Sequence, residues 1–236
     1  MQAKFGITEI PRSIETACES ARLAEEHGFD MVGVADSQSL FRELFVTLSV
    51  IGGATERVVI GPTVTNPSTR HPTVMASGLA SIQEIAGGRA FLGIATGDSA
   101  IYNLGERPRG LAGLKEYIQA LRRLFAGEHT EFGGKPIHTR WTGGLDQPRV
   151  PIYIAAEGPK TLELAGVVAD GVFCGMGFSL GVAKVTIDHI RTGAERAALV
   201  SVIRMELAST AHHAFRFTQE CKLVPPQFAD AIREVQ

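Results

Sequence analysis

The sequence is poor in the residues that mark disulfide-rich and metal-binding folds, with only three cysteines among 236 residues. Cys18, Cys174 and Cys221 lie far apart and form no C-x-x-C pair, so we expect reduced thiols and neither a disulfide framework nor a zinc site. The pair His212-His213 has no third ligand at metal-binding spacing. No metal site is therefore predicted.

Blocks of one charge and long apolar runs are also absent. The net charge is -2 and there is no lysine or arginine cluster, which argues against a nucleic-acid footprint or a polybasic membrane patch. No apolar run approaches the roughly 18 residues that a membrane helix needs, and the first segment, MQAKFGITEIPRS, has no apolar signal region. We therefore expect a cytoplasmic protein without a nucleic-acid or membrane partner.

The common catalytic motifs are missing too, since the sequence contains no G-x-S-x-G, no H-E-x-x-H and no P-loop. The segment GMGFSLG, which begins at Gly175, resembles a dinucleotide fingerprint, but its third glycine comes one residue late and no acidic ribose partner is obvious about 20 residues further on. The backbone N–H groups of Gly175, Met176 and Gly177 remain candidates for holding a phosphate.

Short apolar segments alternate with amphipathic ones along most of the chain. Alternation of this kind is typical of parallel strands joined by right-handed helical crossovers. Strands are predicted over Lys4–Ile7, Met31–Ala35, Val58–Gly61, Ala90–Ile94, Pro151–Ala156 and Gly171–Cys174, with a weaker seventh over Val200–Leu207 and no visible eighth. Helices are predicted from a Ser13 cap to Glu26, and over Leu40–Ile51 (stopped by Gly52-Gly53), Thr73–Ala86, Leu114–Leu124, Lys160–Ala169 and Val182–Ala198.

The alternation is interrupted over about residues 101–150. The segment GEHTEFGGKPIHTRWTGGLDQPRV is either a small hairpin that turns at Gly133-Gly134 or a long loop. It is either a lid over a substrate pocket or a solvent-exposed insertion without function. We expect a single domain over residues 1–236 that carries this insertion.

Polar loops follow the carboxyl ends of the predicted strands, which is the edge where parallel α/β folds bind ligands. Their glycines let the backbone approach a flat, polar-edged ring, although tight strand-to-helix turns need the same residue types. Because several such loops converge on one edge, we favour a cofactor site. The candidate cofactor-binding residues are Asp36, Thr63, Val64, Thr65, Asn66, Thr96, Gly97, Glu157, Gly158, Gly175, Met176 and Gly177.

Three carboxylates at this edge are the candidate catalytic residues: Asp98, Glu9 and Asp36. A carboxylate near apolar ring faces has a raised pKa and can donate or accept a proton. Asp98 has an alternative, purely structural role as a helix N-cap.

Three segments, GPTVTNPSTRHP, LGIATGD and PIYIAAEGPKTLELAGVVADGV, resemble the bacterial luciferase-like superfamily. They are most similar to its coenzyme F420-dependent branch, which includes methylenetetrahydromethanopterin reductase, and the resemblance runs from Phe5 to about Cys174. It implies a (β/α)8 TIM barrel. Family members are usually longer and close the barrel with two further βα units, so this barrel is apparently incomplete at its C-terminal end, either because segments are missing from the sequence or because the member is short.

The resemblance also implies residue roles. A non-prolyl cis peptide that backs the cofactor ring would fall between Thr63 and Val64, and the family's acid after the fourth strand matches Asp98. The polar position after the second strand is Asp36, and the family's early acid falls near Glu9. Gly158 and Gly175 resemble positions that line the ribityl and phosphate groups of the cofactor.

The implied activity is hydride transfer between coenzyme F420 and a small organic substrate, in a homo-oligomer that we expect to be a dimer. An FMN-dependent monooxygenase of the same superfamily is the nearest alternative. A non-catalytic oligomeric binding protein with a degraded site is the alternative from another class.

Overall fold

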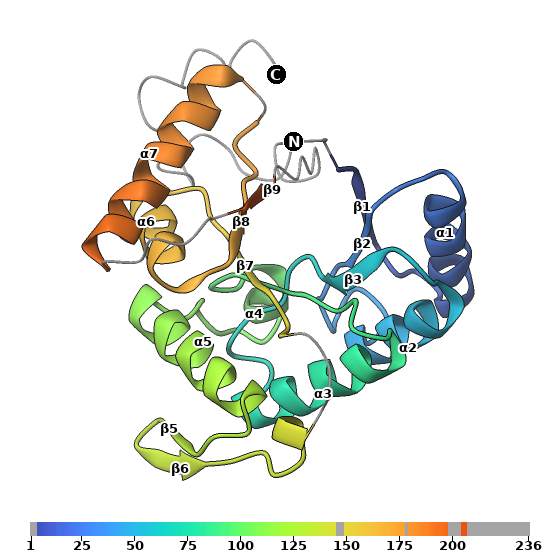
Figure 1. Cartoon of the computed structure of the whole chain (residues 1–236), viewed down its shortest axis with the longest axis horizontal. Coiled ribbons are helices and arrows are strands. Elements are labelled where there is room, and N and C mark those ends of the chain that lie inside the picture. The colour runs from blue at the N-terminus through green and yellow to red at the C-terminus, as the bar shows by residue number, and fades with distance from the viewer. Residues whose placement is uncertain (1–3, 145–148, 178, 198–203, 207–236) are drawn as a thin grey trace. The chain divides into compact units, whose positions relative to one another are not determined.

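Parallel strands alternate with helices along the chain, as the apolar pattern predicts. The computed structural model describes residues 4–144, 149–177, 179–197 and 204–206. The chain divides into two compact units, residues 1–154 and 155–236, and each is described by itself (Figure 1).

Unit 1 is built on parallel strands. β1 (Gly6–Glu9), β2 (Met31–Val34) and β3 (Val59–Pro62) form a sheet in that order. β4 (Leu92–Ile94) follows β3 through isolated parallel bridges and pairs in parallel with β7 (Ile152–Ala155). The carboxyl ends of β1 to β4 therefore lie at one edge, as the alternation requires.

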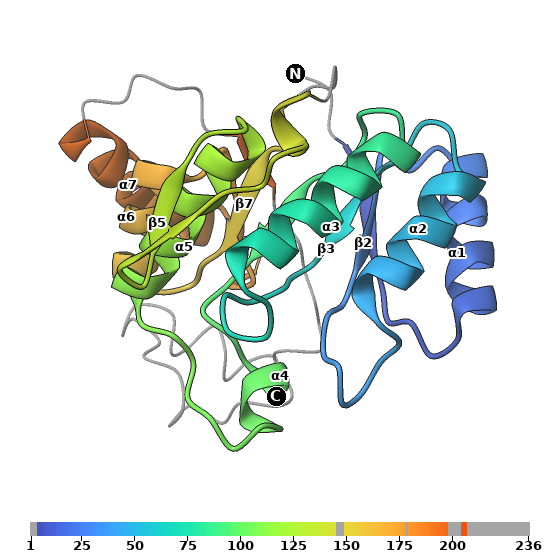
Figure 2. The same cartoon turned by 90° about the horizontal axis from the view of Figure 1, so that it is seen from below.

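Three helices lie side by side along these strands (Figure 2): α1 (Ile14–Glu26), α2 (Leu44–Ala54) and α3 (Pro72–Ile85). The predicted N-cap of α1 is confirmed, because the Ser13 hydroxyl accepts a hydrogen bond from the Thr16 N–H at 3.0 Å. The apolar faces of the helices and strands form one core, made of Ala17, Ala21, Ala24, Val32, Val34, Leu44, Leu48, Ile51, Val58, Ile60, Ile82, Ala86 and Ala90.

The predicted bounds of two elements are wrong. β1 begins at Gly6 and includes Glu9, because its ladder with β2 pairs Gly6 with Met31 and Glu9 with Val34. α2 begins after Glu43, whose carboxylate accepts from the Val46 N–H, and it continues through Gly52-Gly53 to Ala54. The glycines do not stop the helix because Gly52 packs on the core: a Cβ added there would lie 3.1 Å from Ile60 Cδ1.

The insertion contains two helices, α4 (Ser99–Tyr102) and α5 (Leu111–Phe125), and a short 3-10 helix, Thr142–Gly144. Between them, β5 (Thr130–Phe132) pairs antiparallel with β6 (Lys135–Ile137), so the hairpin alternative is confirmed. Its turn is Gly133-Gly134 with φ of 59° and 71°, the left-handed backbone of a tight hairpin turn.

Unit 2 contains α6 (Pro159–Val168), β8 (Gly171–Phe173), α7 (Leu180–Arg196) and β9 (Arg204–Glu206), with β8 and β9 parallel. α6 and α7 pack closely at glycines: a Cβ on Gly166 would lie 2.1 Å from the Ile190 carbonyl oxygen. β9 lies inside the weaker seventh strand predicted over Val200–Leu207. The other residues of that segment, His212-His213, and Ala198 at the predicted end of α7 lie outside the described residues.

Candidate active site

In unit 1 the candidate residues lie where β1 to β4 end. Glu9 is the last residue of β1, and its carbonyl accepts from the Ala35 N–H at 2.9 Å, beyond the end of β2. The Thr63 N–H donates to the Val34 carbonyl at 2.8 Å in the same way. These bonds extend the parallel ladder past the strands, so they bring Glu9, Asp36 and Thr63 to one edge.

The peptide bond between Thr63 and Val64 is cis, which confirms the position expected from the resemblance. The Thr63 hydroxyl donates to the Thr8 hydroxyl oxygen at 3.1 Å. A Cβ on Gly33 would lie 2.2 Å from Thr63 Cγ2, so the absence of a side chain at position 33 gives Thr63 its place against β2.

The side chains of Thr65 and Asn66 are buried and hydrogen-bonded within unit 1, with 1% and 2% exposure. Asn66 Oδ1 accepts from the N–H groups of Ser68 and Thr69, both at 2.9 Å, which turns the chain toward α3. These two candidates therefore shape the loop from inside, whereas Thr63 and Val64 are half-buried at its surface.

Asp36 is the centre of a buried polar cluster. Arg70 donates to both of its carboxylate oxygens, with Nη1 at 2.6 Å from Oδ2 and Nη2 at 3.3 Å from Oδ1. The Thr65 hydroxyl donates to Oδ2 at 2.6 Å, and Arg70 Nη2 also donates to Glu43 Oε1 at 2.7 Å. Burial by itself lowers the pKa of Arg70, but the negative charges and hydrogen bonds of Asp36 and Glu43 together outweigh it, so the pKa is raised.

Arg70 is the residue of this edge that the sequence analysis missed. It precedes His71, which is the N-cap of α3, and Pro72 at the first helical position. The Arg70 carbonyl accepts from the Tyr117 hydroxyl at 2.9 Å, and burial raises the pKa of Tyr117. The signal in the sequence is a cation in a polar loop directly before a helix, which is too common to single out.

Thr96, Gly97 and Asp98 follow β4. Gly97 has a φ of +117°, and a Cβ there would lie 2.5 Å from Ile101 Cγ1, so the turn requires glycine. Asp98 occupies the N-cap position of α4, and its carbonyl accepts from the Ile101 N–H at 2.8 Å. The N-cap position is the one that the structural alternative expects, but the Asp98 side chain makes no capping hydrogen bond there.

Glu9 is the candidate carboxylate whose pKa is shifted upward. Burial raises the pKa of Glu9 above its usual value, and a hydrogen bond with Ser20 offsets part of that rise. A raised pKa increases the protonated fraction of this carboxyl group at any given pH, which is the direction that a general acid needs.

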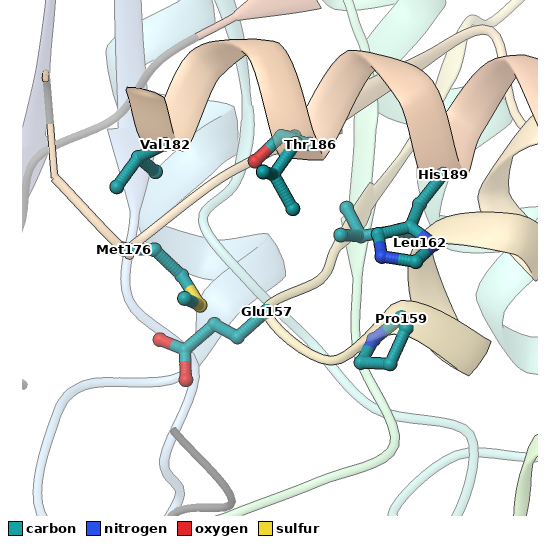
Figure 3. A pocket seen from close by; sticks show the side chains of 8 residues that line it. Glu157, Pro159, Leu162, Met176, Val182, Thr186 and His189 are labelled. Carbon is teal, nitrogen blue, oxygen red and sulfur yellow. The ribbon is translucent and has the colours of Figure 1, made fainter. Parts of the chain in front are cut away.

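In unit 2, Glu157 and Met176 line a small cavity of ≈ 10 Å³ between α6 and α7 (Figure 3). Its other lining residues are Pro159, Leu162, Val182, Val185, Thr186 and His189. Gly175 lies against the Glu157 carboxylate: a Cβ on Gly175 would lie 2.8 Å from Glu157 Oε1. Gly158 is the N-cap of α6, and Gly177 has a φ of +103°.

A second, larger groove of ≈ 790 Å³ lies between α5 and the β5–β6 hairpin, and it includes none of the candidate residues. Within the described part of the chain, no group of three or more His, Cys, Asp or Glu side chains is placed to hold a metal ion. Over the same residues, no helix is both long enough and apolar enough to cross a bilayer.

The chain belongs to the family described as luciferase-like monooxygenase, whose profile matches residues 3–220. It is 38% identical over 202 residues to the 5,10-methylenetetrahydromethanopterin reductase of Methanolobus tindarius, a match that covers 82% of this chain and 60% of the relative. It is 35% identical over 214 residues to the F420-dependent glucose-6-phosphate dehydrogenase of Nakamurella multipartita, with the same coverage of 82% and 60%.

Solved structures confirm the predicted luciferase-like (β/α) barrel class of the fold. An F420-dependent secondary alcohol dehydrogenase in complex with an F420-acetone adduct superposes with a TM-score of 0.76 at 23% identity, over 89% of this chain and 68% of that one. The chain spans about 60% of the length of the curated relatives named above.

Proposed function

We propose that this chain carries the catalytic edge of an oxidoreductase that transfers a hydride between coenzyme F420 and a small organic substrate. The observation that carries the proposal is the 35% identity to an F420-dependent dehydrogenase over 82% of this chain. We further propose that residues 1–236 form one barrel domain, with the segment of about 101–150 as an insertion.

The residues of unit 1 fit a planar cofactor at the strand ends. Ala35 and Ala95 have small side chains directly after β2 and β4 and are half-buried, which supports the placement of a ring against the backbone there. Thr63 and Val64 would lie beneath that ring, and Thr96 and Gly97 beside it. For unit 2, taken by itself, we propose that the backbone N–H groups of Gly158, Gly175 and Gly177 bind an anionic group.

The bound cofactor would supply the ring carbon that accepts or returns the hydride. The chain's own residues would bind and orient the ring and handle the proton that the substrate loses with the hydride. Asp98 is the leading acid because its half-buried side chain makes no capping bond, and Glu9 is the second because burial raises its pKa.

Titration of the full chain with F420 and, separately, with FMN tests the cofactor. We expect saturable binding of F420 and much weaker binding of FMN. Tighter binding of FMN would favour the monooxygenase alternative, because reduced FMN reacts with oxygen. Failure to bind either molecule would favour a non-catalytic binding protein and end the proposal.

Asp98→Asn tests the proton role. The amide keeps the shape of the side chain but cannot take up or release a proton, so we expect turnover to fall by about 10²–10⁴-fold while F420 affinity changes little. Asp188→Asn, at an exposed carboxylate on α7, is the matched control. Equal turnover of the Asp98 variant and the parent would remove Asp98 from the mechanism.

We also propose that the protein is a homodimer that pairs through α2 and α3. α2 contains no charged residue, and large apolar side chains on both helices are exposed: Val46 by 55%, Val50 by 39%, Val74 by 54% and Ile85 by 46%. Exposed apolar faces of this kind mark protein interfaces. Sedimentation should show a dimer that Val46→Glu dissociates and Leu180→Glu, on α7, does not; a monomeric parent would refute the pairing.

A further inference from the structure

We propose that Arg70 is a positioning residue for the edge formed by the ends of β2, β3 and β4. It holds Asp36, and through Asp36 it holds the Thr63–Asn66 loop in the shape that the cofactor needs. The inference rests on the proposed function, because it takes this edge as the place where F420 binds.

The guanidinium is held from several sides. It donates to both oxygens of Asp36 and to Glu43, and its carbon lies 5.2 Å from the centre of the Phe45 ring. The side chain of Arg70 is 12% exposed and that of Asp36 is 4% exposed. A buried pair of this geometry is directional, because the planar fork of arginine matches both carboxylate oxygens.

Asp36 passes this constraint to the loop after β3. Its Oδ2 accepts from the Thr65 hydroxyl at 2.6 Å as well as from Arg70. The Thr65 backbone is bonded on the other side to the end of β4, with its N–H 3.0 Å from the Gly93 oxygen and its carbonyl 2.9 Å from the Ala95 nitrogen. The chain Arg70–Asp36–Thr65 therefore ties the end of β2 to the end of β4 across the loop that holds Thr63 and Val64.

This arrangement separates the roles of the candidate carboxylates. Both oxygens of Asp36 accept charge-assisted or hydroxyl hydrogen bonds within unit 1, so Asp36 acts as an anchor. The Asp98 side chain makes no capping bond and remains the acid. Arg70 itself acts through Asp36 and is not a catalytic residue.

The test is a double-mutant cycle on F420 affinity, with Arg70→Lys, Thr65→Val and the double variant. Lysine keeps the charge but loses the two-pronged contact, and valine keeps the shape of threonine without the hydroxyl. We expect each single change to raise the Kd for F420 at least threefold. We expect the Kd of the double variant to be at most twofold higher than that of the single variant that binds F420 more weakly, because both changes break the same chain of contacts.

Arg123→Met is the control, because Arg123 forms an exposed ion pair with Glu128 on the insertion. We expect it to leave the Kd unchanged. Arg70→Met should raise the Kd at least tenfold and more than Arg70→Lys does, so that partial rescue by lysine distinguishes positioning from general stability. Circular dichroism and urea unfolding confirm that the compared variants are folded.

Two results would overturn the proposal while leaving the proposed function intact. One is an F420 affinity of Arg70→Lys and Arg70→Met within twofold of the parent. The other is a double variant whose Kd rises by the product of the two single effects. A parent chain that binds no F420 would instead refute the proposed function, and this inference with it.

Discussion

Arg89 offers a quantitative test of how unit 1 is held together. Its guanidinium lies at the end of α2 and donates to three carbonyl oxygens, those of Val58 at 2.6 Å, Thr55 at 2.7 Å and Gly52 at 3.2 Å. The three residues that own these oxygens are buried. Arg89→Met removes these three hydrogen bonds and a longer one to the Thr55 hydroxyl at 3.3 Å. The carbonyls of Gly52 and Thr55 at the end of α2, and that of Val58 before β3, then lose this donor.

The magnitude follows from the contacts. A net contribution of about 1 kcal/mol for each hydrogen bond gives about 3 kcal/mol, and partial access of water lowers the expected loss to about 2–3 kcal/mol. For a chain of this size, 1 kcal/mol corresponds to roughly 2–4 °C in Tm, so the loss is roughly 4–12 °C.

Urea and thermal unfolding followed by circular dichroism measure the effect. Arg89→Lys should recover part of the loss, since one ammonium group replaces a fork that contacts several carbonyls. Arg123→Met should change stability by less than about 0.5 kcal/mol, because exposed ion pairs contribute little. A loss below about 1 kcal/mol for Arg89→Met would refute the claim that this guanidinium terminates α2.

Two further changes test other contacts in unit 1. The Glu25 carboxylate accepts from the N–H groups of Glu56, Arg57 and Val58; burial raises its pKa, these bonds lower it, and the net direction is downward. The contribution of this carboxylate to the free energy of unfolding is therefore complete above the pKa that Glu25 has in the unfolded chain, and it is lost as the pH falls through the folded pKa. Glu25→Gln should flatten the acid limb of a stability–pH curve. An unchanged limb would contradict this. Gly61→Ala would place a Cβ 2.2 Å from the Phe91 backbone oxygen and should lower the free energy of unfolding by about 1–3 kcal/mol or more. Gly110→Ala is the control, because the space around Gly110 is open, and it should cost less than about 1 kcal/mol. Urea unfolding measures both variants.

The local pattern of the sequence was enough to predict most elements of the fold. The Ser13 cap, the six main strands and the hairpin turn at Gly133-Gly134 all depend on neighbours in the sequence, and all are found close to where they were expected. α2 was misplaced because its end is decided by packing: Gly52 contacts the core and Arg89, far along the chain, binds its last carbonyls.

For the candidate site, the sequence by itself determined which residues follow the strand ends, because strand order and the parallel direction place those loops at one edge. It could not assign their side chains. Asp36, Glu9 and Asp98 look alike as acids after strands, yet in the structure Asp36 is held by Arg70 and Thr65, burial raises the pKa of Glu9, and the Asp98 side chain caps nothing. Those differences arise from residues distant in sequence and from burial, which only the tertiary structure decides.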